Sequence, residues 1–352
     1  MLRLSQREGK IAQYAISFSQ MKSNPDVSVV LSVRNGGADL PKAIGSILAQ
    51  SFTDFELIAI NNGSTDGTRS YLDSITDPRV RVFHQADAGL AAALNRGISL
   101  AQGRYIARQD HDDLANPARI GKQVAFLDAN PEHGLVGTRA EIWVGDRPSG
   151  RFYDPPTEDQ ILKFDLLFNN PFVHSSVMMR KSALDQVGVY TTDKARQPPE
   201  DYELWSRISR RYRVANLAER LTVYREVSTS MSRAGERPFL EKLVTISSEN
   251  LAYATGATAP QQVHVDIASL IHHAPARVSQ SPDVKAMFAV IAEAGQRIGG
   301  GKPGPELARK IARARYRLVR RQLAYGWMWR TARTIRGRLS RLKQATAPGD
   351  RR

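Results

Sequence analysis

The sequence of 352 residues contains 41% apolar, 24% charged and 7% aromatic residues, which is the composition of a globular protein with a sizeable core. It has no cysteine, no apolar run near the roughly 18 residues of a membrane-spanning helix and no apolar signal-peptide core, so disulfides, cysteine-ligated metals, thiol nucleophiles and a membrane span are excluded. The net charge of +15 adds a basic surplus, and together these features predict a soluble or peripheral protein of the cytoplasm.

Strands and helices are predicted to alternate after a polar leader over residues 1–25. The apolar runs predict strands over residues 27–33, 55–60, 79–83 and 104–107. Helices are expected over residues 39–50, with Asp39 as the capping residue, from 66, over 90–101 and from 116. This alternation with short connections indicates an α/β fold with a doubly wound, Rossmann-like parallel sheet.

The second half of the chain has a different pattern. Residues 157–160 (Thr-Glu-Asp-Gln) match a capping box before a helix, and 173–179 have the composition of a strand. A helix is expected from Glu200, and closing strands are expected over 214–217 and 221–224. Further helices are predicted over residues 240–253, 263–272, 283–298 and 306–342, with a Gly- and Pro-rich hinge at 299–305.

Three polar clusters follow predicted strands directly, at residues 34–37, 61–66 and 110–113. Ligands of doubly wound sheets bind at the carboxyl ends of the strands. We therefore expect these three loops to form one site.

The acidic run Asp110-His111-Asp112-Asp113 is the most informative of the three clusters. Three carboxylates so close together repel one another unless a cation or solvent relieves them. Oxygen ligands of this kind suit Mg²⁺ or Mn²⁺, which complete their coordination with substrate phosphates. The alternative is an acidic turn that caps the next helix.

Other polar residues admit a structural explanation beside a functional one. Asn62 could contact a nucleobase through its amide, or serve as an ordinary turn residue. Asp201 could act as a general base, or favour the start of its helix through its charge. For His174 we favour a hydrogen-bonded histidine of the core.

Taken together, the ordered motifs resemble those of family 2 glycosyltransferases, over roughly residues 26–227. The motifs that carry the resemblance are residues 27–32 (VSVVLS), 50–57 (QSFTDFEL), 62–68 (NGSTDGT), 94–98 (LNRGI), 101–107 (AQGRYIA), 110–113 (DHDD) and 200–205 (EDYELW). The resemblance implies a GT-A fold, in which a nucleotide-sugar-binding half and an acceptor half share one sheet. It also implies transfer of a sugar from a nucleoside diphosphate with inversion at the anomeric carbon.

The resemblance assigns donor-binding roles to residues of the first two loops. Ser32 and Asn62 match positions that contact the nucleobase, and Arg34 and Asn95 are further candidates for binding the nucleotide sugar. Many relatives carry Asp-Asp where this chain has Asn61-Asn62. An Asn carbonyl can accept a hydrogen bond from N3–H of uracil, as an Asp does, but the amide also donates. A uridine nucleotide is the expected donor.

The resemblance also assigns the acidic residues. Asp110 and Asp112 match the Asp-x-Asp motif, with Asp112 as the principal ligand of Mg²⁺ or Mn²⁺ and Asp110 as a donor and metal contact. Asp201 matches the catalytic base, with Glu200 as its acidic neighbour. Direct displacement needs no covalent intermediate.

We therefore expect an inverting glycosyltransferase that transfers a sugar to a saccharide or glycolipid acceptor, in bacterial surface polysaccharide assembly. The expected organisation is a leader (1–25), a catalytic domain (26–227), a helical extension (228–300) and a basic helical tail (301–352). Two alternatives are a nucleotidyltransferase that forms nucleotide sugars and a nucleic-acid-binding protein with a basic tail. The first normally needs a longer, more basic glycine-rich loop than residues 34–37, and the intact acidic motifs argue against the second.

The tail holds most of the basic surplus, with 16 Lys and Arg against Glu306 and Asp350. Its apolar residues, among them Ile311 and Leu318, are expected to face an anionic membrane while the arginines contact headgroups. Trp327 and Trp329 would lie at the interface. The tail thus predicts peripheral binding to the inner face of the cytoplasmic membrane, with no nucleic acid as partner.

Overall fold

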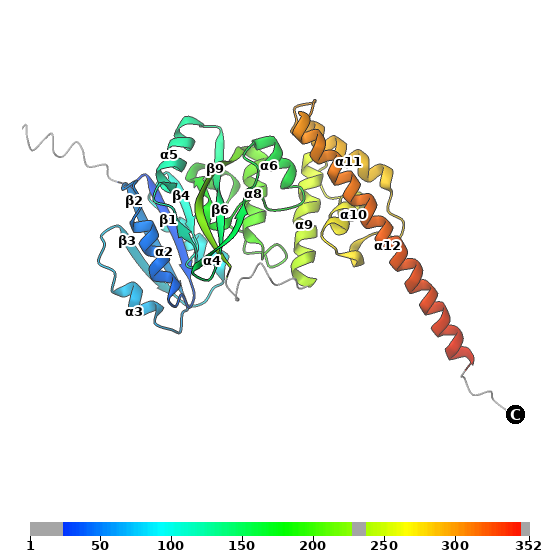
Figure 1. The fold of residues 1–352 in the computed structure, drawn as a ribbon, viewed down its shortest axis with the longest axis horizontal. Helices are drawn as coiled ribbons and strands as arrows, with labels where there is room; N and C mark the ends of the chain where they lie inside the picture. Colours follow the sequence, from blue (N-terminus) through cyan, green and yellow to red (C-terminus); the bar gives the residue numbers. More distant parts are fainter. Residues whose placement is uncertain (1–23, 227–236, 346–352) are drawn as a thin grey trace, which may run out of the picture. The chain divides into compact units, whose positions relative to one another are not determined.

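The computed structural model describes residues 24–226 and 237–345, with side chains over 24–226 and 239–325 (Figure 1). The predictions for most of the leader and for the side chains of Trp327 and Trp329 lie outside these residues. The chain forms two compact units. We call the first, residues 1–155, 172–190 and 211–228, the sheet unit, and the second, residues 156–171, 191–210 and 229–352, the helical unit.

The sheet unit contains all the strands of the nine-stranded sheet. Its strands are β1 (Val27–Val33), β2 (Phe55–Asn62), β3 (Val80–Gln85), β4 (Tyr105–Gln109), β5 (Leu114–Ala115), β6 (His133–Val144), β7 (Arg147–Tyr153), β8 (Met178–Arg180) and β9 (Arg213–Glu226). Its helices are α2 (Asp39–Leu48), α3 (Thr68–Asp73), α4 (Leu90–Leu100), α5 (Arg119–Ala129) and α7 (Lys181–Val187).

The sheet has the order β3-β2-β1-β4-β8-β6-β9-β5, with β7 paired to β6. The first four strands are parallel, and β8 then pairs with β4 in the antiparallel direction. The predicted parallel sheet is therefore present only in the first half, and the second half is mixed. Since β1 lies between β2 and β4, the chain order reverses at β1, which is where such folds bind ligands.

The apolar residues on both faces of β1 explain why helices cover both faces of the sheet there. Val27, Val29, Leu31 and Val33 belong to one buried cluster with apolar residues of α2 and α5. Val30 points to the other face, where α4 packs closely: a Cβ on Gly97 would lie 2.5 Å from Val30 Cγ1. A strand covered on both faces must be apolar throughout, which is why the run over 27–33 was predictable.

Several local predictions differ from the structure. Residues 173–179 are not one strand, because His174–Ser176 form a 3₁₀ turn before β8. The segments 214–217 and 221–224 are joined in the single strand β9, whose register with β6 shifts between them. Ala38 rather than Asp39 precedes α2, and no side chain caps α2 or α6 (Asp159–Asp165), so the predicted capping box at 157–160 is absent.

The helical unit consists of α6, α8 (Glu200–Arg211, whose last residue belongs to the sheet unit), α9 (Arg237–Ala254), α10 (Gln262–Ile271), α11 (Val284–Ile298) and α12 (Pro305–Ala345). Its core includes a stripe of α12 formed by Leu307, Ile311, Ala314 and Leu318. The spacing of three and four residues places this stripe on one helix face. The prediction that Ile311 and Leu318 face a membrane is therefore wrong, because both are buried against other helices of their own unit.

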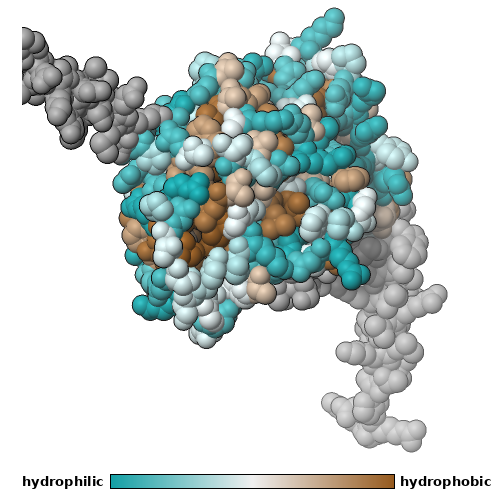
Figure 2. Space-filling view, turned by 60° about the vertical axis from the view of Figure 1, so that its left-hand side comes forward, coloured by the Kyte–Doolittle hydropathy of each residue, from teal (hydrophilic) through white to brown (hydrophobic). Residues whose placement is uncertain are grey.

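Among the described residues, no helix is both long enough and apolar enough to cross a membrane. The face of the molecule in Figure 2 is mostly hydrophilic, with hydrophobic residues visible between polar ones. Scattered apolar residues of this kind are normal on protein surfaces.

Candidate active site

The carboxyl ends of β2, β1 and β4 lie side by side, as predicted from the three polar clusters. The register pairs Leu31 of β1 with Gln109 of β4 and Val33 of β1 with Asn61 of β2. Neighbouring strands are about 4.8 Å apart, so β2 and β4 lie about 10 Å from each other across β1. The loops that follow these three strands form one edge of the sheet unit.

Hydrogen bonds join the loops after β1 and β2. The backbone N–H of Asn35 donates to Ser64 Oγ at 2.9 Å, and the N–H of Thr65 donates to Asn35 Oδ1 at 2.8 Å. The N–H of Gly36 donates to Thr68 Oγ1 at 2.8 Å. The two loops thus hold each other before any ligand binds.

Asn62, the predicted nucleobase contact, has its carbonyl oxygen already engaged. Asn62 Oδ1 accepts hydrogen bonds from Gln85 Nε2 at 2.8 Å and from the Ala88 N–H at 3.0 Å. Its amide lies 3.3 Å from Asp87 Oδ1, and Arg34 Nη1 forms an ion pair with Asp87 Oδ2 at 2.7 Å. The structure thus brings Arg34 and Asn62 together through a carboxylate that the sequence had not singled out.

Asp87 comes this close because Gly63 lies beside it. Gly63 has a φ of +72°, and a Cβ there would lie 2.6 Å from the backbone nitrogen of Asp87. A side chain at this position would separate the loop after β3 from the end of β2. The Asn-Gly pair, first interpreted as turn chemistry, therefore has a packing role as well.

The other two donor-site candidates are Ser32, which lies on β1, and Asn95, which lies on α4. Ser32 is 5% exposed on β1, one residue before the strand ends. Asn95, on α4, donates from Nδ2 to the Tyr190 carbonyl at 2.8 Å. Because that bond ties α4 to the chain after α7, it gives Asn95 a structural task in addition to the predicted contact with the nucleotide sugar.

The carboxylate of Asp110 is held by a buried arginine. Arg108 is 1% exposed, and its Nη2 lies 2.5 Å from Asp110 Oδ1. Burial by itself would raise the pKa of Asp110, but the charge and hydrogen bond of Arg108, together with His174 and His111, outweigh it and leave the pKa below its ordinary value. Asp110 is therefore ionised and oriented by the protein.

Asp113 points into the interior instead of toward the strand ends. It is 2% exposed and accepts hydrogen bonds from the Ser175 hydroxyl and, at 2.8 Å, from the Arg225 N–H. Burial and the negative charges of Asp110 and Asp112 raise its pKa well above the ordinary value. Asp113 thus joins the acidic loop to β9 and is not placed to bind a ligand.

Asp112 is the carboxylate that remains available. Within the described part of the chain, no other residue donates a hydrogen bond or forms an ion pair to its side chain. Burial and the neighbouring charge of Asp110 raise its pKa. No group of three His, Asp or Glu side chains in the described residues could enclose a metal ion by itself. One or two carboxylates at an open edge instead suit a divalent cation that takes further oxygens from its substrate.

A second buried arginine supports the same loop. Arg119, at the start of α5, is fully buried and donates to Gln109 Oε1 at 3.0 Å, to the Arg108 carbonyl at 3.2 Å and to the Ser175 carbonyl. Sequence analysis missed Arg108 and Arg119. The available signal was charge within apolar segments, since Arg108 lies in the strand β4 and Arg119 precedes an apolar helix face.

His174 confirms the structural interpretation. Its Nε2 accepts hydrogen bonds from Tyr190 Oη at 2.9 Å and Arg108 Nε at 3.3 Å. Burial and the positive charge of Arg108 lower the pKa of His174 to about 3, so the ring is neutral at physiological pH.

Asp201 and Glu200 lie in the first turn of α8, in the helical unit. Asp201 Oδ2 accepts a hydrogen bond from Asn170 Nδ2 at 2.8 Å, and Oδ1 accepts one from the Tyr202 N–H at 2.7 Å. Glu200 is buried, with 6% of its surface exposed. The two hydrogen bonds to Asp201 hold its carboxylate in one orientation.

Known proteins resemble this chain in sequence and in fold. The model of glycosyl transferase family 2 matches residues 28–188. The chain is 36% identical over 220 residues to the glycosyltransferase EpsE of Bacillus subtilis, which covers 60% of this chain and 77% of that protein. It is 30% identical over 244 residues to an uncharacterized glycosyltransferase of Haemophilus influenzae, covering 66% and 75% of the two chains.

A solved structure shows the same fold. The crystal structure of S. aureus TarS residues 1–349, in complex with UDP-GlcNAc, superimposes with a TM-score of 0.58 at 15% identity and covers 87% of this chain and 92% of that chain. The similarity shows a GT-A fold for this chain, as expected from the sequence.

We predict that Arg108→Met lowers the free energy of unfolding by about 3 kcal/mol, because it removes a buried partner from the Asp110 carboxylate, whose side chain is only 26% exposed. The matched control is Arg34→Met, which removes the exposed pair with Asp87, where the side chains are 58% and 40% exposed. That change should cost less than about 1 kcal/mol. Urea unfolding of the wild type and the two variants measures both changes. Equal losses of unfolding free energy would show that the Arg108–Asp110 pair stabilises the protein no more than the exposed Arg34–Asp87 pair.

Proposed function

The chain belongs to glycosyl transferase family 2 and is a glycosyltransferase, and we propose that it transfers a sugar from a UDP-linked donor, with inversion, to a saccharide or glycolipid acceptor. The observation that carries the proposal is the edge where β2, β1 and β4 end. The loops there carry Arg34, which pairs with Asp87, and the Asp112 carboxylate, which has no side-chain partner in the described chain. Family membership supports this activity over the nucleotidyltransferase and nucleic-acid-binding alternatives. The proposed role is in bacterial surface polysaccharide assembly.

The donor nucleotide is proposed to bind at the loops after β1 and β2. Arg34 supplies a positive charge for the diphosphate, and hydrogen bonds between the loops fix its backbone in advance. TarS, which shares the fold, binds UDP-GlcNAc, and we extend a uridine nucleotide to this chain. Asn62 Oδ1 already accepts two hydrogen bonds, and the Asp87 carboxylate is bound by Asn62, the Gly89 N–H and Arg34. Ser32 is therefore the proposed acceptor for the base.

The residues present fit Mg²⁺ or Mn²⁺. Asp112 offers a carboxylate with no protein partner in the described chain, and Asp110 offers a second one fixed by Arg108. Such a cation, when bound, neutralises charge on the leaving diphosphate. Arg108 lowers the pKa of Asp110, so this second carboxylate carries its charge when a cation binds.

Asp201 is proposed as the general base. Its carboxylate accepts the proton of the acceptor hydroxyl while that oxygen attacks the anomeric carbon and the bond to the diphosphate breaks. Asn170 and the start of α8 hold the carboxylate in place. No enzyme nucleophile is needed for this displacement.

We predict that Asp112→Asn weakens Mn²⁺-dependent binding of UDP by more than about tenfold, because the variant loses the negative charge that attracts the cation. Isothermal titration with Mn²⁺ or with EDTA measures the effect. Asp154→Asn is the control, since Asp154 is an aspartate on the same unit that pairs with Arg220 at 2.6 Å. Undiminished, EDTA-sensitive binding by Asp112→Asn would remove this residue from the metal site.

We predict that Asp201→Asn keeps UDP binding and lowers turnover by about 10²–10⁴-fold, the usual contribution of a general base. The measurement is UDP release during transfer or donor hydrolysis. Glu203→Gln serves as control because Glu203 is also a first-turn carboxylate of α8 but pairs with Arg207 at 2.7 Å. Turnover of Asp201→Asn within a few fold of the control would return Asp201 to a role in starting the helix.

The outer face of α12 is proposed to bind an anionic membrane surface, which would hold the enzyme at the inner face of the cytoplasmic membrane near a lipid-linked acceptor. Opposite the buried stripe, α12 exposes four arginines and two large apolar residues, Arg309, Arg313, Arg317, Arg320, Tyr316 and Leu323. Tyr316 and Leu323 are 64% and 65% exposed. Each arginine near such a surface contributes about 1 kcal/mol. The proposed membrane binding therefore depends on attraction between these arginines and the anionic surface. Ile311 and Leu318, which are buried, do not insert into the membrane.

We predict that the full chain floats with vesicles containing phosphatidylserine but not with neutral vesicles, and less at high salt. Changing the four arginines of this face to Gln should reduce bound protein more than about tenfold. The control removes four exposed arginines of the sheet unit, at positions 69, 147, 151 and 213. Equal flotation of both quadruple variants would mean that net charge, and not α12, causes binding.

A further inference from the structure

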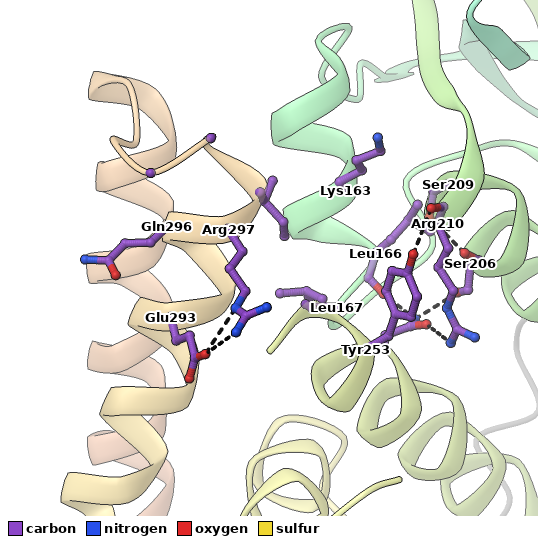
Figure 3. Close-up of a pocket in the computed structure, with 15 residues that line it drawn as sticks. Lys163, Leu166, Leu167, Ser206, Ser209, Arg210, Tyr253, Glu293, Gln296 and Arg297 are labelled. Atoms are coloured by element: carbon purple, nitrogen blue, oxygen red, sulfur yellow. Dashed lines mark hydrogen bonds and ion pairs between the residues drawn. The ribbon is translucent and has the colours of Figure 1, made fainter. Parts of the chain in front are cut away.

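The helical unit contains a pocket of its own, which none of the residues discussed above for the donor, the metal or the base lines (Figure 3). Its volume is about 660 Å³, within the range of small-molecule sites. Side chains from α6, α8, α9 and α11 and two glycines after α11 surround it. All of these belong to the helical unit.

The lining of the pocket is basic. Lys163, Arg210 and Arg297 lie around it in Figure 3, against the single carboxylate of Glu293. Arg297 pairs with Glu293 at 3.1 Å, and Lys163 pairs with Asp159 at 3.2 Å. Basic groups from three helices that converge on one cavity favour a negatively charged ligand.

Arg210 is the cation with spare donors. Its Nη2 donates to Asn250 Oδ1 at 2.9 Å, and its Nε is buried without a hydrogen-bond partner among the described residues. No carboxylate in the described chain forms an ion pair with it. Asn250 is itself fixed by bonds from Nδ2 to the Leu166 carbonyl at 2.7 Å and to Ser206 Oγ at 2.8 Å. The guanidinium is thus positioned but incompletely satisfied, as a binding group for an anion would be.

Tyr253 gives the pocket an aromatic surface. The residue is 54% exposed although its hydroxyl donates to the Arg210 carbonyl at 2.9 Å. The Arg210 guanidinium lies 5.1 Å from the ring centroid. The guanidinium covers one face of the ring, and the exposed remainder of this fixed aromatic ring can pack against the apolar face of a sugar ring.

We propose that this pocket binds a negatively charged part of the saccharide acceptor, with a carboxylate or phosphate at Arg210 and Arg297 and a sugar ring against Tyr253. The assignment to the acceptor rests on the proposed function. Arg210 and Asp201 lie on the same helix, nine residues apart, which corresponds to about 13–14 Å along α8. A chain of several sugars can span that length, so one end can lie in the pocket while a distant hydroxyl reaches the base.

The test is calorimetric titration of the full chain, with UDP and Mn²⁺ at saturation so that the nucleotide site is filled. The probes are trigalacturonate for the carboxylate, glucose 6-phosphate for the phosphate and maltotriose as the neutral sugar. At least one anionic probe should bind more tightly than maltotriose. Arg210→Gln, Arg297→Gln and Tyr253→Ala should each weaken that binding about tenfold or more, the loss expected for a charge-assisted hydrogen bond.

Lys285→Gln is the matched control, because Lys285 is an exposed basic residue of α11 outside the pocket and should leave binding unchanged. Arg297 is 57% exposed, so its variant tests the pocket even where Arg210→Gln affects folding. The proposal is overturned if neither anionic probe binds better than maltotriose, or if Arg297→Gln and Tyr253→Ala bind as the wild type does. Sugar transfer is assayed separately: normal transfer without probe binding refutes only the pocket, whereas binding without transfer refutes the proposed function.

Discussion

The candidate site depends on the balance of buried charge beneath the end of β4. Arg108 and Arg119 are removed from water. Burial, opposed by the charge of Asp113 and assisted by that of Arg108, lowers the pKa of Arg119 to about 10. Such burial is tolerable only when carboxylates and carbonyl groups surround the guanidinium groups. Asp110, Asp113 and several backbone carbonyls do so here. The acidic loop is therefore held by opposite charges inside the protein, whereas the Asp112 carboxylate has no such partner within the described chain.

The order of the strands places the other loops of the site beside the acidic loop. Because β1 is flanked by β2 and β4, the loop after β1 sits between the acidic loop and the loop that contains Asn62. Gly63 lets the loop after β3 join them, which places Asp87 against Arg34. Four loops from separate parts of the chain thus become a surface with fixed polar groups, and little ordering is left for a ligand to impose.

Much of this edge was predictable because its signals are local. A buried strand followed by polar residues is visible in a window of ten residues, and Asp110 and Asp112 were identified in that way. The partners of the acidic loop were not, since Ser175 and Arg225 lie 62 and 112 residues from Asp113. The 3₁₀ turn at His174 and the burial of Ile311 and Leu318 also depend on distant contacts. An amphipathic helix shows from sequence that it has an apolar face, but not what covers that face.

The two faces of α12 have separate physical tasks, and this separation leaves the outer one free to vary. Leu307, Ile311, Ala314 and Leu318 form a wall of the core of the helical unit, so substitutions there change stability. The arginines opposite them are exposed, where most substitutions change stability by less than about 0.5 kcal/mol. The surface charge of this helix can therefore be adjusted in evolution or by design, one residue at a time, while the fold that carries the catalytic groups stays intact.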